Sequence, residues 1–203
     1  MELYLIRHGE RYRNLSEYYD TEKQTMNPPL TPKGILQAER LAKRCADIPF
    51  DAIYASDLTR AKHTAEIMNE TVRTKLIITD AFREIRVGEL NHKTWEDFPE
   101  LYEQWNSHEE DTPYPDGENG SMVWERCKPV LADIIGQNPQ RAAVVCHGGT
   151  IRVIICGLLG LPMQKRFFIG NPPLNCALTI LQMQNGRWFL HTLNDAAHTA
   201  DLS

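Results

Sequence analysis

The chain opens with Met1-Glu2-Leu3-Tyr4-Leu5-Ile6-Arg7-His8-Gly9-Glu10, an apolar run followed at once by an arginine, a histidine and a glycine. The run from Leu3 to Ile6 predicts a buried strand, which places Arg7 and His8 at its carboxyl end. In α/β proteins, ligands bind at the carboxyl ends of strands. An arginine suits an oxyanion there, a histidine suits nucleophilic or acid–base chemistry, and Gly9 would let the backbone approach a ligand closely.

A second segment repeats this order of features far downstream. The apolar run from Ala142 to Cys146 is followed directly by His147-Gly148-Gly149-Thr150. Two histidines that each follow a strand and precede a glycine predict one shared site rather than two unrelated features, because ligands bind at the carboxyl ends of strands.

The composition is that of one globular domain over residues 1–203, with 42% hydrophobic and 24% charged residues. A net charge of −5 without a basic tract argues against a nucleic-acid partner. No apolar run approaches the roughly 20 residues that span a bilayer, so no membrane association is expected. The N-terminus lacks the layout of a signal peptide. The five cysteines show neither a C-x-x-C pair nor metal-ligand spacing, which predicts reduced thiols in a cytoplasmic protein.

The alternation of elements predicts an α/β three-layer sandwich with a largely parallel central sheet. Thr31 is expected to cap one helix, and Ser56 or Asp57 the next. Asn185-Gly186 predicts a closing hairpin, whose edge strand could pair with a second copy in a homodimer. Residues from about 85 to 118 are expected to form a lid-like insertion, and those from about 196 a mobile tail. The expected strands are 3–6, 52–55, 76–78, 144–145, 177–182 and 188–193, and the expected helices begin near 32, 58, 122 and 149.

Six segments occur in the order found in the histidine phosphatase (phosphoglycerate mutase-like) superfamily, and together they resemble its phosphatase branch. They are Arg7-His8-Gly9-Glu10, Leu30-Thr31-Pro32-Lys33-Gly34, Ser56-Asp57-Leu58-Thr59-Arg60-Ala61, Arg83-Glu84-Ile85, Gly117-Glu118 and His147-Gly148-Gly149-Thr150. The resemblance covers residues 1 to about 175 and implies a phosphoglycerate mutase-like fold.

The resemblance also implies a role for each catalytic residue. His8 would attack phosphorus and form a phosphohistidine, while Arg7 and Arg60 bracket the phosphoryl oxygens. His147, protonated beside the phosphate, would stabilise charge in the transition state. Glu84 would protonate the leaving alkoxide and later activate water. Neither a metal nor a cofactor is expected, because arginines and histidines supply the positive charge.

Substrate binding would involve further residues near these motifs. Asn14 is similar to the family's asparagine at this position, and the Gly148 N–H at a helix start could donate to phosphate. Arg11 and Arg13 stand where the family commonly has other residue types, and they favour a substrate with further negative charge, although solvated loop charge explains them equally well. Glu10, Glu89 and Glu118 remain alternatives to Glu84 as the acid.

These observations favour a metal-independent phosphomonoesterase that acts on a small phosphorylated metabolite. The runner-up is a bisphosphoglycerate-dependent phosphoglycerate mutase, which the acidic character of residues 85–120 disfavours. An α-ribazole phosphatase of cobalamin synthesis and a sugar-bisphosphate phosphatase are open alternatives. A non-catalytic phosphate- or phosphoprotein-binding module is the alternative from another class.

Overall fold

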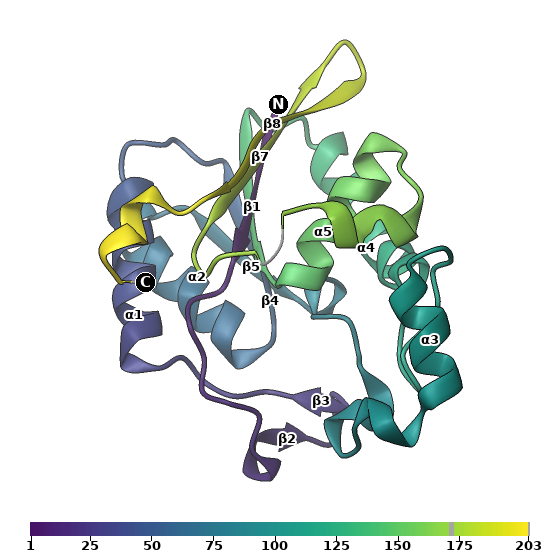
Figure 1. The fold of residues 1–203 in the computed structure, drawn as a ribbon. Helices are drawn as coiled ribbons and strands as arrows, with labels where there is room; N and C mark the ends of the chain where they lie inside the picture. Colours follow the sequence, from purple (N-terminus) through teal and green to yellow (C-terminus); the bar gives the residue numbers. More distant parts are fainter. Residues whose placement is uncertain (171–172, 203) are drawn as a thin grey trace.

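A six-stranded sheet organises the computed structural model, which describes residues 1–170 and 173–202 (Figure 1). Its strand order is β5-β4-β6-β1-β7-β8. The first four strands in this order pair in parallel, and β7 and β8 pair antiparallel at one edge. The strands are β1 (Glu2–Arg7), β4 (Ala52–Ser56), β5 (Lys75–Thr79), β6 (Arg141–Cys146), β7 (Leu178–Gln184) and β8 (Arg187–Asp195).

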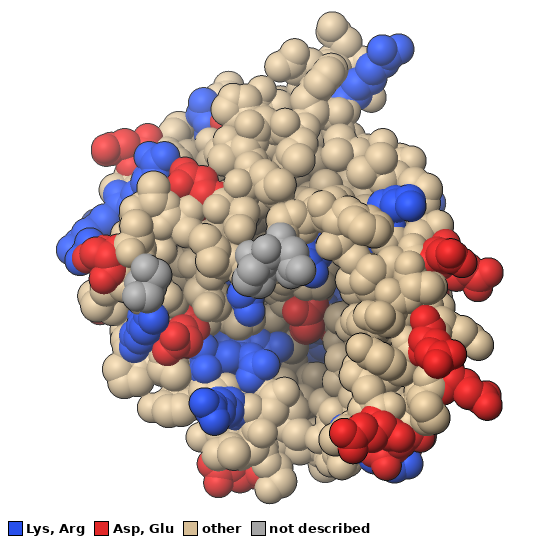
Figure 2. Space-filling model, viewed as in Figure 1, with Lys and Arg blue, Asp and Glu red and all other residues tan. Residues whose placement is uncertain are grey.

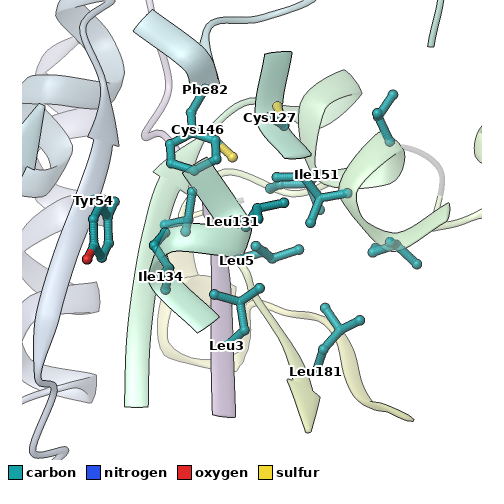
Figure 3. Close-up of a cluster of buried hydrophobic side chains, with 14 of the residues drawn as sticks. Leu3, Leu5, Tyr54, Phe82, Cys127, Leu131, Ile134, Cys146, Ile151 and Leu181 are labelled. Atoms are coloured by element: carbon teal, nitrogen blue, oxygen red, sulfur yellow. The ribbon is translucent and has the colours of Figure 1, made fainter. Parts of the chain in front are cut away.

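Helices cover both faces of the sheet, so the expected three-layer α/β sandwich is confirmed. On one face lie α1 (Pro32–Arg44) and α2 (Thr59–Val72), and on the other lie α4 (Gly120–Gly136) and α5 (Gly148–Leu159). The alternation along β1 produces this division, because successive side chains of a strand point to opposite faces. Leu3 and Leu5 belong to the core beneath α4 and α5 (Figure 3), whereas Tyr4 and Ile6 belong to the core beneath α1 and α2.

The starts of the two helices on the first face differ in how they are capped. Thr31 caps α1 as predicted, and its side chain accepts a hydrogen bond from Gly34 N at 3.0 Å. The prediction for α2 is wrong, because its N-cap is Leu58 and the first N–H of the helix, on Thr59, donates to Asn27 Oδ1 at 2.8 Å. Asp57 instead binds Arg83 through both carboxylate oxygens, at 2.8 and 2.6 Å.

The segment between β5 and α4 contains only short elements. They are η2 (Asp80–Phe82), η3 (Gly88–Asn91), η4 (Trp95–Asp97) and α3 (Pro99–Ser107). A small hairpin of β2 (Tyr19–Asp20) and β3 (Thr25–Met26), preceded by η1 (Ser16–Tyr18), contacts η3. The aromatic rings of Tyr19 and His92 meet between them, with centroids 4.6 Å apart. That this segment acts as a lid stays a prediction.

The C-terminal part of the described chain packs against other elements. After α5 comes η5 (Met163–Phe168), and the chain ends in η6 (Ala197–Leu202), which contacts α1. Arg40 of α1 pairs with Asp201 at 3.2 Å, and Thr199 is buried. The mobile tail expected from about residue 196 therefore stays a prediction that this packing does not favour. In the ranges described, no helix is long and apolar enough to cross a bilayer.

Candidate active site

The two strand-end histidines lie side by side. β1 and β6 are parallel neighbours in which Arg7 is opposite Cys146, so His8 and His147 leave the sheet at the same edge. Their ring centroids are 5.1 Å apart, and their side chains are 2% and 0% exposed. The structure therefore brings together the two segments that the sequence analysis predicted to share a site.

The structure requires glycine at position 9 because of close backbone packing, whereas the sequence suggested close approach to a ligand. A Cβ atom at Gly9 would lie 2.4 Å from the carbonyl oxygen of Gly34, and one at Gly34 would lie 1.9 Å from Glu10 O. The start of α1 thus packs directly against the backbone that follows His8. Hydrogen bonds from Gly9 N to Thr64 Oγ1 and from Glu10 N to Gln37 Oε1 hold the same backbone.

The hydrogen bonds of His8 define its tautomer. Its Nδ1 lies 2.7 Å from the Gly9 carbonyl oxygen, which can only accept, so Nδ1 carries the proton. The lone pair of Nε2 accepts from Arg60 Nε at 3.2 Å. Burial lowers the pKa of His8 well below 6.5, and the charges of Arg60 and Arg7 lower it further. His8 is therefore a neutral imidazole with an available Nε2, as a nucleophile requires.

Arg60 and Arg7 flank His8 from different elements. Arg60 comes from α2, is 4% exposed, and donates from Nη1 to Met26 O at 3.1 Å. Burial lowers its pKa to about 10, so it stays charged at neutral pH. Arg7 donates from Nη1 to Pro173 O, and its buried Nε has no hydrogen-bond partner among the described residues. Two guanidinium groups beside one imidazole suit the oxygens of a phosphoryl group.

Gly148 lies next to Arg7 at the first position of α5. A Cβ at Gly148 would lie 3.7 Å from Arg7 Nε. The first N–H groups of a helix lack partners within the helix and favour anions. That the Gly148 N–H contacts phosphate stays a prediction.

The ring of His147 is neutral here, and its expected protonation beside a bound phosphate stays a prediction. Its Nε2 lies 2.9 Å from Ser56 Oγ, and its Nδ1 is buried without a partner in the part of the chain that the structure describes. Burial lowers the pKa of His147 well below 6.5, with Arg60 and His8 as further causes. The expectation assumed a phosphate beside the ring. Without that negative charge, burial and Arg60 disfavour the imidazolium.

Glu84 joins the site at the start of α5. Its Oε1 accepts from Thr150 N at 3.1 Å and its Oε2 from Gly149 N at 3.2 Å. The backbone that presents it is held by Arg126, which donates to the carbonyl oxygens of Arg83 and Glu84 at 2.8 and 3.2 Å. Glu84 is also among the charges that act on both Arg7 and Arg60, which places it at the same site.

The three alternative acids each have a partner, and one of them, Glu10, also lines the cleft that contains Arg7. Glu118 accepts from Arg86 N and from Arg126 Nε. Glu89 pairs with Lys93 at the surface, and Glu10 accepts from Thr31 Oγ1 at 2.8 Å. Of the four carboxylates, Glu84 is the one bound to the N-terminus of α5, and that it is the acid stays a prediction.

Arg11, Arg13 and Asn14 lie at the mouth of the site. They line an open cleft of about 380 Å³ together with Arg7 and Asn175. Arg11 Nη1 donates to Asn14 Oδ1 at 2.5 Å, and Arg13 and Asn14 are exposed. Figure 2 shows lysine and arginine side chains gathered around a hollow near the centre of this face. That Arg11, Arg13 and Asn14 contact substrate stays a prediction.

Sequence reasoning missed several residues of this site. Ser56 was interpreted only as a helix cap, although it holds His147. Arg126 gave no signal, because a polar residue on an amphipathic helix is expected to face solvent. Arg152 and Arg166, which line a cavity beside Glu84, gave none either. Within residues 1–170 and 173–202, no three His, Cys, Asp or Glu side chains are grouped as metal ligands.

Comparisons with known proteins agree with this geometry. The chain is 28% identical over 205 residues to "Putative phosphoserine phosphatase 2" of Hydrogenobacter thermophilus, covering 99% of this chain and 98% of the relative. It is also 28% identical over 211 residues to "Probable phosphoglycerate mutase GpmB" of Salmonella arizonae, covering 98% and 94%. A solved structure of the mycobacterial glucosyl-3-phosphoglycerate phosphatase with inorganic phosphate matches with a TM-score of 0.82 and 25% identity, covering 97% and 98% of the two chains. Residues 3–196 match the family model of the histidine phosphatase superfamily (branch 1), and the chain therefore belongs to that superfamily.

Proposed function

We propose that the protein is a metal-independent phosphomonoesterase that hydrolyses a small phosphorylated metabolite through a phosphohistidine at His8. The observation that carries the proposal is the buried pair of His8 Nε2 and Arg60 Nε, 3.2 Å apart, next to the ring of His147. In this pair, His8 is the neutral nucleophile and Arg60 is the cation held beside it. The relatives named as phosphatases of phosphoserine and of glucosyl-3-phosphoglycerate support the class of substrate.

In the first step, His8 Nε2 attacks phosphorus and the bond from phosphorus to the alcohol oxygen breaks. Glu84 gives a proton to that oxygen, so the alcohol leaves neutral. The phosphorylated ring keeps its Nδ1 proton and donates it in a hydrogen bond to the Gly9 carbonyl oxygen, which lies 2.7 Å from Nδ1. This bond stabilises the positive charge that the ring acquires.

In the second step, water attacks phosphorus while Glu84 takes its proton, and the bond between nitrogen and phosphorus breaks. Arg7 and Arg60 neutralise the phosphoryl oxygens in both steps. The phosphate raises the pKa of His147 by its negative charge, so that ring donates to a phosphoryl oxygen when substrate is bound. These groups supply the charge that a metal ion supplies in other phosphatases.

A phosphoglycerate mutase is the second candidate. The name of the relative from Salmonella arizonae and the two arginines beside Glu84 favour it. A mutase must hold a second phosphate, however, and acidic side chains predominate in residues 85–118. This charge balance favours hydrolysis.

The decisive experiment traps the phosphoenzyme and follows both products. Incubation with a labelled phosphomonoester and a basic quench should yield an acid-labile label that His8→Ala lacks. A panel of phosphorylated metabolites, with excess chelator present, should release phosphate without isomerised product. Primer-dependent interconversion of 3- and 2-phosphoglycerate would establish the mutase instead. Loss of activity in chelator would contradict the metal-independent mechanism.

A further inference from the structure

A cavity of about 240 Å³ opens beside Glu84. Tyr114, Arg152, Arg166 and Phe167 line it together with Gly149. In the proposed reaction Glu84 protonates the leaving oxygen, so the alcohol part of the substrate must lie against this carboxylate. The cavity is therefore placed to receive that part.

Arg166 lines this cavity and has a guanidinium donor without a partner among the described residues. The side chain is 3% exposed, and its Nη1 donates to Met163 O at 3.0 Å and to Asp111. Its buried Nη2 has no hydrogen-bond partner among the residues that the structure describes. A buried N–H without an acceptor is unfavourable, and an acceptor on a bound ligand would remove that penalty.

Asp111 fixes Arg166 but does not satisfy Nη2. Its Oδ1 also accepts from Gly120 N at 2.9 Å, and its Oδ2 accepts from Ser121 N and Oγ, both at 2.7 Å. The guanidinium carbon of Arg166 stacks 4.3 Å from the centroid of Phe167. The guanidinium is thus held in one orientation before any ligand arrives, which reduces the entropic cost of binding.

The charged side chains that line the cavity favour a ligand group with a single negative charge. Asp111 balances Arg166, and Glu84 balances Arg152 only while Glu84 is ionised. Once Glu84 carries the proton that it donates, one positive charge remains. Burial raises the pKa of Tyr114 to about 12, so its hydroxyl stays protonated and adds no charge. A carboxylate matches this balance better than a phosphate dianion does.

We infer that this cavity binds a carboxylate on the alcohol part of the substrate, and that Arg166 is the residue that recognises it. The inference rests on the proposed function and narrows its substrate to a small phosphorylated hydroxy acid. The volume of the cavity, about 240 Å³, also limits the size of the ligand, because drug-sized ligands occupy cavities of roughly 300–1,000 Å³. A bulky ring-bearing alcohol therefore fits less well than a short carboxylic acid.

The test compares two esters that differ only in the carboxylate, O-phosphoserine and O-phosphoethanolamine. The wild-type protein should prefer O-phosphoserine in kcat/KM by about 10- to 100-fold, as expected for a charge-assisted hydrogen bond. Arg166→Lys keeps a cation beside Asp111 but loses the forked donor, and should reduce this ratio about 10-fold or more. Arg187→Lys, on the exposed hairpin, is the matched control and should keep the ratio. Equal kcat/KM of the wild-type protein for the two esters would overturn the inference.

A binding measurement separates this inference from the proposed function. Calorimetry with 3-phosphonopropionate and propylphosphonate requires no turnover. The carboxylated compound should bind at least 10-fold more tightly to the wild-type protein, and Arg152→Gln should narrow the difference even if Arg166→Lys does not fold. Equal affinities together with intact turnover would overturn the inference alone. A carboxylate preference in binding without any hydrolysis would contradict the proposed function and leave the cavity assignment standing.

Discussion

The phosphate site (Arg7, His8, Arg60 and His147) and the insertion (residues 85–118) are built in opposite ways. The residues of the phosphate site lie at the carboxyl ends of β1 and β6 and at the start of α2, and its histidines are almost fully buried. In the insertion, η3, η4 and α3 contain no buried residue. Under the proposed function, the sheet would hold the catalytic residues in place and the peripheral segments would select the substrate.

The insertion is held mainly by aromatic contacts and carries the opposite charge. The ring of Trp105 lies 5.1 Å from that of Trp95 and 5.0 Å from that of Phe167, and His108 stacks on Phe167 at 4.0 Å. Acidic side chains gather on its outer surface, at the side of the molecule where α3 lies (Figures 1 and 2). Positive charge in the hollow, together with acidic side chains on the insertion, would direct an anion inward.

Replacement of His8 is expected to have the largest effect. His8→Ala should reduce kcat by about 10⁴-fold or more, because it removes the nucleophile of the proposed reaction. Steady-state release of phosphate and the amount of trapped phosphoenzyme both measure this. His191→Ala, on the exposed face of β8, is the control and should leave both unchanged. Retention of the phosphoenzyme in His8→Ala would mean that another residue is the nucleophile.

Replacement of Glu84 should have a smaller effect that depends on the leaving group. Glu84→Gln keeps the size of the side chain but cannot donate a proton to the alcohol. We expect alkyl phosphates to lose about 10² to 10⁴ in kcat/KM, and p-nitrophenyl phosphate, with its good leaving group, to lose far less.

The control for this prediction is Glu89→Gln, since Glu89 forms its ion pair with Lys93 at the surface. It should behave as wild type with both substrates. Equal losses in Glu84→Gln for good and poor leaving groups would show that Glu84 stabilises charge rather than transferring a proton.

The fold and the centre of the phosphate site were predictable because their signals are local. Periodicity defines β1 and β6, and residues that directly follow parallel neighbours must converge at one edge. Arg126 and Arg166 could not be predicted in the same way. Each acts on backbone or side chains far away in sequence, as in the bond from Arg126 Nη2 to Arg83 O. Such pairing depends on how helices pack, which periodicity does not encode.

The lowered pKa of His147 in the absence of phosphate could not be predicted for a related reason. Its pKa depends on burial and on Arg60 of α2, and neither is visible at the strand end where the histidine stands. The cap of α2 was wrong because Asp57 is taken up by Arg83, which lies 26 residues further along the chain. Tertiary contacts override local preferences at both positions.

The lowered pKa values of the two histidines predict a pH-dependent stability. Both folded-state values lie below the unfolded value near 6.5, so the unfolded chain binds protons first as the pH falls. Their contribution to stability is full above about pH 6.5 and is lost as the pH falls toward the folded-state values. The free energy of unfolding should fall by about 1.4 kcal/mol per pH unit for each histidine.

Urea unfolding between pH 6.5 and 5.5, above the range in which most carboxylates titrate, measures this slope. His147→Asn should reduce the slope by about one histidine's share. An unchanged slope in that variant would show that His147 is already protonated in the folded protein, and the neutral imidazole described for the phosphate site would be wrong.

The smallest effect is expected from the insertion. Trp105→Ala removes ring contacts within the insertion and with Phe167, but those contacts hold elements without buried residues. Such contacts stabilise a local unit rather than the whole domain. Amide hydrogen exchange should therefore accelerate in residues 88–107, while the free energy of global unfolding changes by about 1 kcal/mol or less.

The comparison variant is Leu5→Ala, in the core beneath α4 and α5. It should lower the free energy of unfolding by about 2–5 kcal/mol. If Trp105→Ala destabilises the domain as much as Leu5→Ala does, the insertion and the sheet unfold as one unit. The insertion, proposed to select the substrate, and the phosphate site, proposed to carry out the reaction, would then not be separate structural units.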